Sequence, residues 1–369
     1  MIDACDVAVI GLGPAGSSAA LAAARGGARV IGLDRKKQPG VPVQCAEFVP
    51  MMLGVDSGPV DSAFVQTIMA MESFIDNRHD RHNDDFRGRM IDRAAFDREL
   101  AARATAAGAD LRFGVQVEEI AADGTIHLND DTQIRARVIV GADGPRSRVG
   151  AAVGQSNSAI VETRQASVPL LRPSESTDIY LSASIPGGYA WVFPKGEVAN
   201  VGLGVDRRWK DRLKPELESL LDWLAGQGQV GREVLRYTGG AIPVGGPVQS
   251  TAALGDALVL LAGDAAGLTN PVTGAGIPAA CHSGRMAGEA AAAHVAGDGD
   301  AAEDYAEELD ELFGASLARA VMRRQQLVDL YRADGPNDDN LRQGWIAYPA
   351  YWARENSDHG ERRDELLEA

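Results

Sequence analysis

The sequence is poor in cysteine and contains no long uncharged apolar run. Its three cysteines are far apart in a chain of 369 residues, and no Cys-x-x-Cys or Cys/His ligand spacing occurs, so neither a disulfide framework nor a zinc site is predicted. The longest apolar stretch, near 252–268, is interrupted by Asp256 and Asp264, so no membrane span is expected. His79 and His82 have no further ligands nearby in sequence, and we interpret them as solvated loop residues, with no metal site.

Positive charge is also scarce. The chain has 36 Lys and Arg residues against 52 Asp and Glu residues, a formal net charge of −16, and only five lysines. Binding to nucleic acid requires a basic surface, so nucleic acid is excluded as a partner, and attraction to an anionic bilayer is not favoured either. The apolar content of 45% is typical of a soluble globular protein. Because the predicted fold begins within the first residues, we expect no leader and a cytoplasmic location.

The sequence does contain a dinucleotide-binding motif at its start. The apolar run Val7–Ile10 predicts a buried parallel strand, and Gly11, Gly13 and Gly16 follow it in the spacing G-x-G-x-x-G before an alanine-rich helix. In this motif the first glycine permits a sharp turn, the second lets the backbone approach a pyrophosphate, and the third lets the helix pack on the strand. The positive end of the helix dipole then faces the phosphates.

A second predicted strand, 28–33, supports the same interpretation. It ends in Asp34, roughly 20 residues after the motif, where a carboxylate can accept hydrogen bonds from an adenosine ribose. Strand, glycine turn, helix and acidic residue in this order predict a dinucleotide site.

The remaining chain predicts an α/β fold with an insertion. The first pattern continues in a predicted helix at 92–107, strands at 110–117 and 133–140, and a strand at 257–262 that precedes a long helix of small residues. From residue 155, alternating apolar and polar residues separated by Pro-Gly turns instead predict an antiparallel meander. We therefore predict a discontinuous dinucleotide-binding domain (1–75, 90–154 and 252–297), an antiparallel-sheet substrate domain (155–251) with 76–89 as a loop near it, and a helical C-terminal tail (298–369).

Three fingerprints in this order, the glycine motif, 142–144 (Ala-Asp-Gly) and 263–264 (Gly-Asp), resemble FAD enzymes of the para-hydroxybenzoate hydroxylase fold. Residues 187–196 (Gly-Gly-Tyr-Ala-Trp-Val-Phe-Pro-Lys-Gly) are similar to a characteristic stretch of the geranylgeranyl reductase family. The resemblance covers about residues 1–295. It implies a Rossmann-like FAD-binding domain (GR2/PHBH type) with an inserted antiparallel β-sheet substrate domain, and an FAD-dependent oxidoreductase that reduces carbon–carbon double bonds of an isoprenoid or other apolar substrate.

The same resemblance implies roles for individual residues. It places Asp264 at the ribityl hydroxyls, Asp143 near the pyrophosphate, Arg93 close to the cofactor and the Val117 backbone at the adenine. The residues expected to bind FAD are Gly11, Gly13, Pro14, Ala15, Gly16, Asp34, Arg35, Gln44, Cys45, Ala46, Arg93, Val117, Asp143, Gly144, Gly263, Asp264, Pro271, Gly274, Ala275, Gly276 and Ile277.

Cys45 and a row of aromatic residues are the candidates for the reaction itself. Cys45 sits where many such reductases carry a cysteine near the flavin, which implies a catalytic thiol, although a small residue packed in a loop explains it equally well. Tyr189, Trp191 and Phe193 alternate along one strand and therefore share one face of the sheet. They form either plain core or the wall of an apolar substrate cavity, and Tyr180 can join either.

The sequence contains no second G-x-G-x-x-G, so no separate NAD(P)H-binding domain is predicted. NAD(P)H visiting transiently, or another reductant, is the expected electron donor. Two alternatives to a reductase remain: an FAD monooxygenase that hydroxylates an aromatic or other small molecule, and a flavin electron-transfer protein. A lipid substrate would also imply peripheral membrane contact, and the oligomeric state is not predicted.

Overall fold

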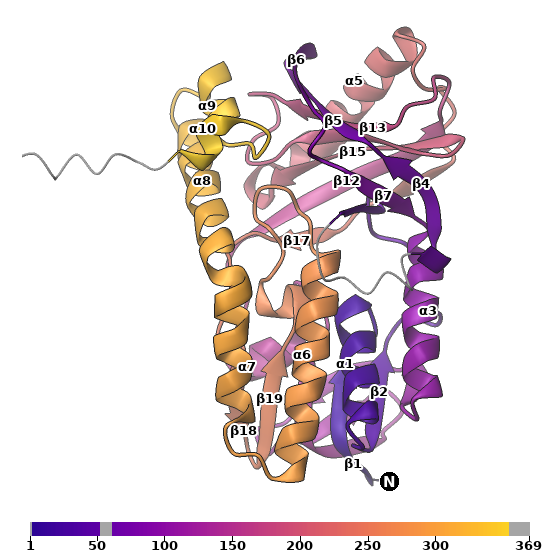
Figure 1. The fold of residues 1–369 in the computed structure, drawn as a ribbon, viewed down its shortest axis with the longest axis vertical. Coiled ribbons are helices and arrows are strands. Elements are labelled where there is room, and N and C mark those ends of the chain that lie inside the picture. The colour runs from indigo at the N-terminus through magenta and orange to yellow at the C-terminus, as the bar shows by residue number, and fades with distance from the viewer. Residues whose placement is uncertain (1, 52–60, 354–369) are drawn as a thin grey trace, which may run out of the picture.

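The computed structural model describes residues 2–51 and 61–353. Figure 1 shows a first sheet with its helices in the lower half of the molecule, a second sheet above it, and a column of C-terminal helices along one side of both. The mixed α/β architecture with a helical C-terminal region agrees with the fold class predicted from the sequence.

The first sheet has the strand order β18-β19-β11-β1-β2-β8, and β9 and β10 form a ribbon attached to β11. Strand β1 lies between β2 and β11 and runs parallel to both. In open parallel sheets, ligands bind at the carboxyl ends of the strands where the strand order reverses in this way. The strands are β1 (Ile2–Ile10), β2 (Val30–Asp34), β8 (Asp110–Phe113), β9 (Val117–Ile120), β10 (Ile126–Leu128), β11 (Gln133–Gly141), β18 (Thr251–Leu254) and β19 (Ala257–Leu261).

Three helices stand side by side against this sheet: α1 (Pro14–Arg25), α3 (Arg93–Ala106) and α6 (Ile277–Ala296) (Figure 1). Small residues let α1 and α6 approach closely, since a Cβ on Gly284 would lie 2.1 Å from the carbonyl oxygen of Ala15. This contact fixes the helix of the glycine motif against the first half of α6. A short helix, α4 (Arg148–Ala152), follows β11.

The second sheet has the order β16-β12-β15-β14-β13-β5-β6, with β17 paired to β12. Its pairs are antiparallel except for β13 and β5, which run parallel. Helix α5 (Leu213–Gly226) buries Leu217, Leu220 and Leu224 against one face of it. The strands are β5 (Ala70–Ile75), β6 (Arg78–Asn83), β12 (Ile160–Pro169), β13 (Ser176–Leu181), β14 (Ala190–Lys195), β15 (Val198–Asp206), β16 (Arg236–Thr238) and β17 (Ala241–Pro243).

The structure corrects the expectation for 70–89. Residues 70–75 were expected in the dinucleotide domain and 76–89 as a loop, but β5 and β6 form a hairpin within the second sheet. Asp76 and Asn77 both have positive φ, as the tight turn of a two-residue hairpin requires. Strand β6 is an edge strand, and charged residues are common on edges because they discourage pairing with other chains. The dense charge therefore marks an edge strand here.

Two further differences concern short strands. The strand expected at 110–117 ends at Phe113, where Gly114 takes a positive φ, and Val117 begins the separate strand β9. A three-stranded sheet, β3 (Phe48–Pro50), β7 (Gly88–Ile91) and β4 (Phe64–Ile68), which the sequence did not indicate, follows the Cys45 loop.

His79 and His82 are held by one carboxylate. Glu72 on β5 lies 2.8 Å from His79 Nε2 and 2.7 Å from His82 Nδ1, and the described residues contain no group of ligands suited to a metal ion. Burial raises the pKa of Glu72, but the hydrogen bonds from both histidines outweigh it and lower the pKa. The hydrogen bond to Glu72 raises the pKa of His82 above 6.5.

The hydrogen bond between Glu72 and His82 predicts a measurable change in the pKa of His82. The contribution of protonated His82 to stability is complete below pH 6.5 and is lost as the pH rises through its raised folded-state pKa. In Glu72→Gln the NMR-determined pKa of His82 should fall toward the ordinary value, whereas Asp84→Asn, whose carboxylate lies farther away at 3.7 Å, should change it less. An unchanged pKa in Glu72→Gln would contradict the assignment.

The C-terminal region ties the two sheets together. Helix α7 (Ala301–Leu309) continues through a π-helical turn (Asp310–Gly314) into α8 (Ala315–Arg332), and the short helices α9 (Asp338–Gln343) and α10 (Pro349–Trp352) follow. The Tyr305 hydroxyl donates to the carbonyl of Leu261 in the first sheet at 2.6 Å. The Tyr331 hydroxyl donates to the carbonyl of Ser182, which follows β13 of the second sheet, also at 2.6 Å. The expected helical tail is thus observed through Ala353, and 354–369 lie outside the described residues. No described helix has the length and apolar character needed to cross a bilayer.

Candidate functional site

The glycine motif has the geometry its spacing predicts. Gly11 takes a φ of +90°, and a Cβ there would lie 2.4 Å from the carbonyl oxygen of Ala142. A Cβ on Gly16 would lie 1.7 Å from the Gly11 oxygen, so only glycine permits this contact between helix and turn. A Cβ on Gly13, in contrast, would meet no atom within 4 Å. The chain leaves open space at the one glycine expected to face a pyrophosphate.

Asp34 braces the glycine turn from the neighbouring strand. Its Oδ2 accepts a hydrogen bond from the Leu12 N–H at 2.8 Å, and its Oδ1 accepts one from the Lys36 N–H at 2.7 Å. The carboxylate therefore lies at the carboxyl ends of β1 and β2, as expected. The side chain of Arg35 is exposed.

Asp264 lies directly after β19, beside the start of α6. Its Oδ1 accepts a hydrogen bond from Thr269 Oγ1 at 2.5 Å. Burial raises the pKa of Asp264, and the Thr269 hydroxyl and the charge of Arg93 oppose that rise. The loop that follows is fixed by Asn270, whose Oδ1 accepts from the N–H groups of Val272 and Thr273 at 3.0 Å each. Pro271, Gly274, Ala275, Gly276 and Ile277 belong to this loop and the first turn of α6.

Asn157 joins two of the three fingerprints and was missed by the sequence analysis. Its Nδ2 donates to the carbonyls of Pro145 at 3.1 Å and Asp264 at 2.8 Å, while its Oδ1 is buried without a hydrogen-bond partner in the structure. A buried acceptor without a donor is costly, so this oxygen is suited to a ligand or to water. An asparagine outside any motif gives no sequence signal for such a role.

Asp143 and Val117 make contacts within the protein. The Asp143 carboxylate accepts from the N–H of Arg148 at 2.6 Å and from the Ser147 hydroxyl, so it stabilises the start of α4. Burial raises the pKa of Asp143, and these hydrogen bonds oppose the rise. The Val117 carbonyl accepts a hydrogen bond from the Arg148 guanidinium. Both residues therefore position the turn around Gly144, and any direct contact with FAD remains a prediction.

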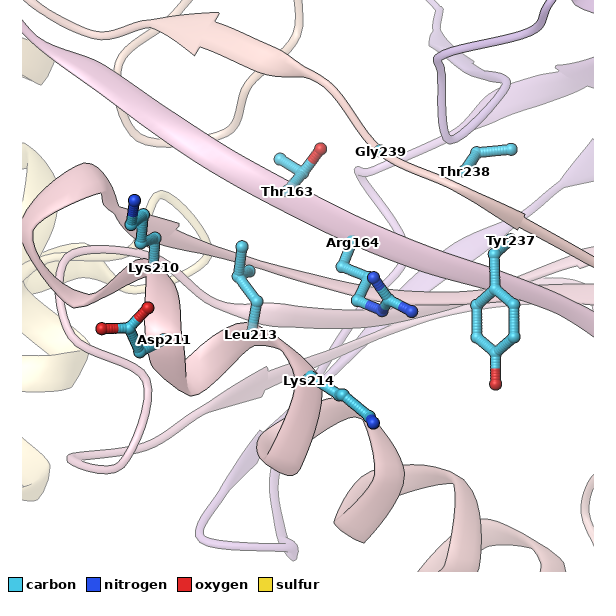
Figure 2. Close-up of a pocket in the computed structure, with 9 residues that line it drawn as sticks. All are labelled: Thr163, Arg164, Lys210, Asp211, Leu213, Lys214, Tyr237, Thr238 and Gly239. Carbon is cyan, nitrogen blue, oxygen red and sulfur yellow. The ribbon is translucent and has the colours of Figure 1, made fainter.

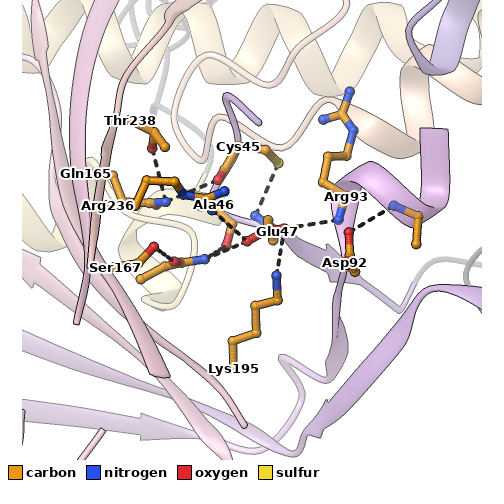
Figure 3. Close-up of polar contacts among 12 residues, drawn as sticks. Cys45, Ala46, Glu47, Asp92, Arg93, Gln165, Ser167, Lys195, Arg236 and Thr238 are labelled. Carbon is orange, nitrogen blue, oxygen red and sulfur yellow. Dashed lines mark hydrogen bonds and ion pairs between the residues drawn. The ribbon is translucent and has the colours of Figure 1, made fainter. Parts of the chain in front are cut away.

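The loop of Cys45 is anchored by Glu47, whose polar contacts are drawn in Figure 3. Glu47 is 1% exposed and has a φ of +69°. Its Oε1 accepts from Arg93 N at 3.0 Å and pairs with Lys195 Nζ at 2.8 Å, and its Oε2 accepts from Asn200 Nδ2 at 3.1 Å. Its own N–H donates to Cys45 Sγ at 3.2 Å. One carboxylate thus connects the Cys45 loop, the start of α3 and strands β14 and β15.

Arg93 brings the Cys45 loop into contact with the rest of the site. Its Nε donates to Asp97 at 2.7 Å. Burial lowers the pKa of Arg93, but the Asp97 carboxylate outweighs burial and raises it, and Cys45 acts in the same direction. The charge of the same guanidinium also opposes the rise in the pKa of Asp264, so Arg93 acts on both Cys45 and Asp264. Gln44 is exposed, and the Ala46 carbonyl accepts from Asn200 at 3.2 Å.

The aromatic row lies on one face of the second sheet. Ring centroids are 5.8 Å apart between Tyr189 and Trp191 and 6.2 Å apart between Trp191 and Phe193. The Tyr189 hydroxyl donates to the carbonyl of Thr273, so the row touches the loop before α6. Trp345, from the tail, packs on Tyr189 at 4.7 Å, and its indole nitrogen is buried without a partner in the structure. The tail contribution gave no signal in the sequence.

Tyr180 is not part of this row. It stacks on Phe74 at 4.6 Å and packs with the α5 side of the sheet, whereas Trp191 and Phe193 pack with the opposite cluster. Adjacent strand positions alternate between faces, and Tyr180 has the same orientation as the residues facing α5. Tyr180 therefore faces α5 and does not join the row, and its role in substrate binding stays a prediction.

Comparison with known proteins identifies the family of this chain. Residues 4–310 match the family model of the FAD binding domain. A digeranylgeranylglycerophospholipid reductase of Methanocaldococcus jannaschii is 32% identical over 305 residues, which are 78% of this chain and 77% of that protein. The chain belongs to the geranylgeranyl reductase family of FAD-dependent oxidoreductases.

Solved structures show that the fold is shared more widely than this family. A geranylgeranyl bacteriochlorophyll reductase-like protein from Thermoplasma acidophilum has a TM-score of 0.77 at 24% identity, covering 93% of this chain and 96% of that one. A probable FAD-dependent monooxygenase from Pseudomonas aeruginosa, PqsL, has a TM-score of 0.68 at 19% identity, covering 89% and 97%. These likenesses establish the fold and leave the reaction open.

The residues of this geranylgeranyl reductase family member fit FAD. Two features lie at the switch point of the first sheet: the open space at Gly13 and the start of α1, which has no side-chain cap. A third, the Asn157 oxygen without a hydrogen-bond partner, lies beside the other two fingerprints. Backbone N–H groups at a helix N-terminus bind phosphate, and a half-buried carboxylate such as that of Asp264 can accept hydrogen bonds from polyol hydroxyls. Which of the expected residues touch the cofactor remains a prediction.

The tail segment over the aromatic row is held by one acidic residue. Asp80 on β6 accepts hydrogen bonds from Arg342 at 2.7 and 3.1 Å and from the Tyr348 hydroxyl at 2.7 Å. The Arg342 hydrogen bond lowers the pKa of Asp80 below 3.8, burial opposes it, and Tyr348 adds to it. The stabilisation that ionised Asp80 gives to the fold is present above its ordinary pKa of 3.8 and is lost as the pH falls through its lowered folded-state pKa.

Asp80→Asn should therefore loosen residues 338–353 at pH 7. We expect amide hydrogen exchange there to accelerate roughly threefold to tenfold, because a solvent-exposed ion pair stabilises the segment only modestly. Asp339→Asn is the matched control, since Asp339 pairs with the same arginine at 2.8 Å but is 87% exposed. Equal exchange in the two variants would contradict the anchoring role of Asp80.

Proposed function

We propose that this protein reduces carbon–carbon double bonds in the geranylgeranyl chains of a glycerophospholipid or a similar apolar isoprenoid. The observation that carries the proposal is the aromatic row of Tyr189, Trp191 and Phe193, which contacts the loop before α6 through Tyr189 and is covered by Trp345. An apolar wall beside the expected flavin loop is suited to an alkene chain. The names of the similar reductases point to the same substrate class.

The protein residues have distinct tasks in this proposal. FAD, when reduced and bound, supplies the hydride, and NAD(P)H or another reductant supplies the electrons. The aromatic row and Trp345 exclude water from the alkene, and Glu47 with Arg93 holds the Cys45 loop in place. Cys45 remains the candidate catalytic residue, because its thiol is oriented by the Glu47 N–H and by Arg93 and can hold the proton that the second alkene carbon needs.

Phe193→Leu tests the aromatic wall. Losing about 50 Å² of apolar contact at about 25 cal/mol per Å² weakens lipid binding by about 1.3 kcal/mol, so KM for a geranylgeranyl lipid should rise about tenfold. FAD content should stay unchanged. Phe74→Leu is the control, because Phe74 packs with Tyr180 away from the row. A similar KM for both variants would contradict the assignment of the row to substrate.

A further inference from the structure

A basin of about 620 Å³ lies on the second sheet (Figure 2). It is an open depression bordered by the middle of β12, the end of β16 and the segment that leads into α5. The residues that line it are Thr163, Arg164, Lys210, Asp211, Leu213, Lys214, Tyr237, Thr238 and Gly239. Its volume is in the range of small-molecule sites.

The charge of the basin is opposite to that of the chain. Arg164, Lys210 and Lys214 face a single lining carboxylate, Asp211, although the chain carries a net charge of −16 and only five lysines in total. Within the described residues, neither Arg164 nor Lys210 has a carboxylate within 4.0 Å, and Lys214 has only Glu218 at 3.7 Å along its own helix. The cations are therefore available to a ligand.

The basin also has a defined shape. The Arg164 guanidinium lies over the ring of Tyr237 at 4.9 Å from its centroid, which orients its donors. Thr238 Oγ1 accepts from Gln165 Nε2 at 3.4 Å, and Gln165 Nε2 also donates to the Cys45 carbonyl at 3.2 Å. One side chain therefore connects the basin wall to the Cys45 loop.

We propose that this basin binds a phosphate ester or diphosphate group, at a site separate from that of FAD. An arginine fixed by stacking and two lysines supply the donors that phosphate oxygens require, and a doubly charged anion gains more from three cations than a carboxylate does. The group can belong to a soluble phosphate compound or to a lipid headgroup, and the two sources are distinguished by experiment.

The test uses protein saturated with FAD, so that the dinucleotide site is filled, and inorganic pyrophosphate as the probe in titration calorimetry. The variant R164Q/K210Q/K214Q should bind pyrophosphate at least tenfold more weakly than the native chain. The control is R135Q/R232Q/R285Q, which removes the same charge from arginines that are 59%, 72% and 52% exposed. It should bind like the native chain. Circular dichroism confirms that both variants fold.

A second measurement identifies the source of the phosphate. Co-sedimentation with phosphatidylglycerol vesicles, but not phosphatidylcholine vesicles, that is lost in the basin variant and kept in the control assigns the basin to a lipid headgroup. Pyrophosphate binding without vesicle binding assigns it to a soluble phosphate. Equal weakening in both triple variants, or no binding of either probe by the native chain, overturns the proposal.

Discussion

Gly16→Ala should destabilise the fold, whereas Gly13→Ala should leave the fold intact and weaken FAD binding. The added methyl at 16 would lie 1.7 Å from the backbone oxygen of Gly11, which cannot move without displacing the strand or α1. Overpacking against backbone costs about 3 kcal/mol or more. At 13 the methyl meets no protein atom, and the φ of −76° suits alanine. It occupies the space where a pyrophosphate would approach.

Chemical denaturation and flavin fluorescence titration separate the two effects. The free energy of unfolding of the apoprotein should fall only in Gly16→Ala, and the Kd for FAD should rise at least about tenfold in Gly13→Ala, equivalent to about 1.4 kcal/mol. If Gly13→Ala binds FAD like the native chain, the glycine turn does not face the pyrophosphate.

Glu47→Ala is expected to lower the free energy of unfolding by about 3 kcal/mol, because it leaves Lys195 largely buried without its carboxylate. The Lys195 side chain is only 17% exposed. The same change removes acceptors from Arg93 N and Asn200, so the Cys45 loop loses its carboxylate link to α3 and keeps only the hydrogen bonds of its Cys45 and Ala46 carbonyls to the second sheet. FAD affinity should therefore fall together with stability, if that loop contacts the flavin as we expect.

Two variants control for simple loss of charge. Glu289→Ala removes an ion pair with Arg285 at 2.6 Å in which both partners are about half exposed, and it should cost under about 1 kcal/mol. Glu47→Gln keeps the shape and part of the hydrogen bonding, and its unfolding free energy should lie between those of the native chain and Glu47→Ala. A Glu47→Ala protein as stable as Glu289→Ala would contradict the central role of this carboxylate.

The fold was predictable where local sequence and tertiary structure demand the same residues. The glycine motif and Asp264 come after buried apolar runs and Asp34 ends one, so the sequence predicts their place at the carboxyl edge of the first sheet. The hairpin of β5 and β6 was mistaken for a loop because an edge strand tolerates charge at most positions. The Asp76-Asn77 pair was the local signal that could have revealed it.

Long-range contacts account for what the sequence could not show. Glu47 becomes the centre of the site only because β14 and β15 bring Lys195 and Asn200 to it from about 150 residues away. Trp345 joins the aromatic row because the tail returns to the second sheet, and Tyr180 leaves it because β13 places alternate residues on opposite faces. None of these pairings has a local pattern.

The proposed reaction is tested most directly under anaerobic conditions. FAD bound to the protein is reduced with dithionite, a geranylgeranyl glycerophospholipid is added, and flavin absorbance near 450 nm is followed with mass spectrometry of the lipid. We predict reoxidation of the flavin and a gain of two mass units for each double bond reduced. A flavin that stays reduced with this lipid until oxygen is admitted would contradict the reductase assignment and favour a monooxygenase.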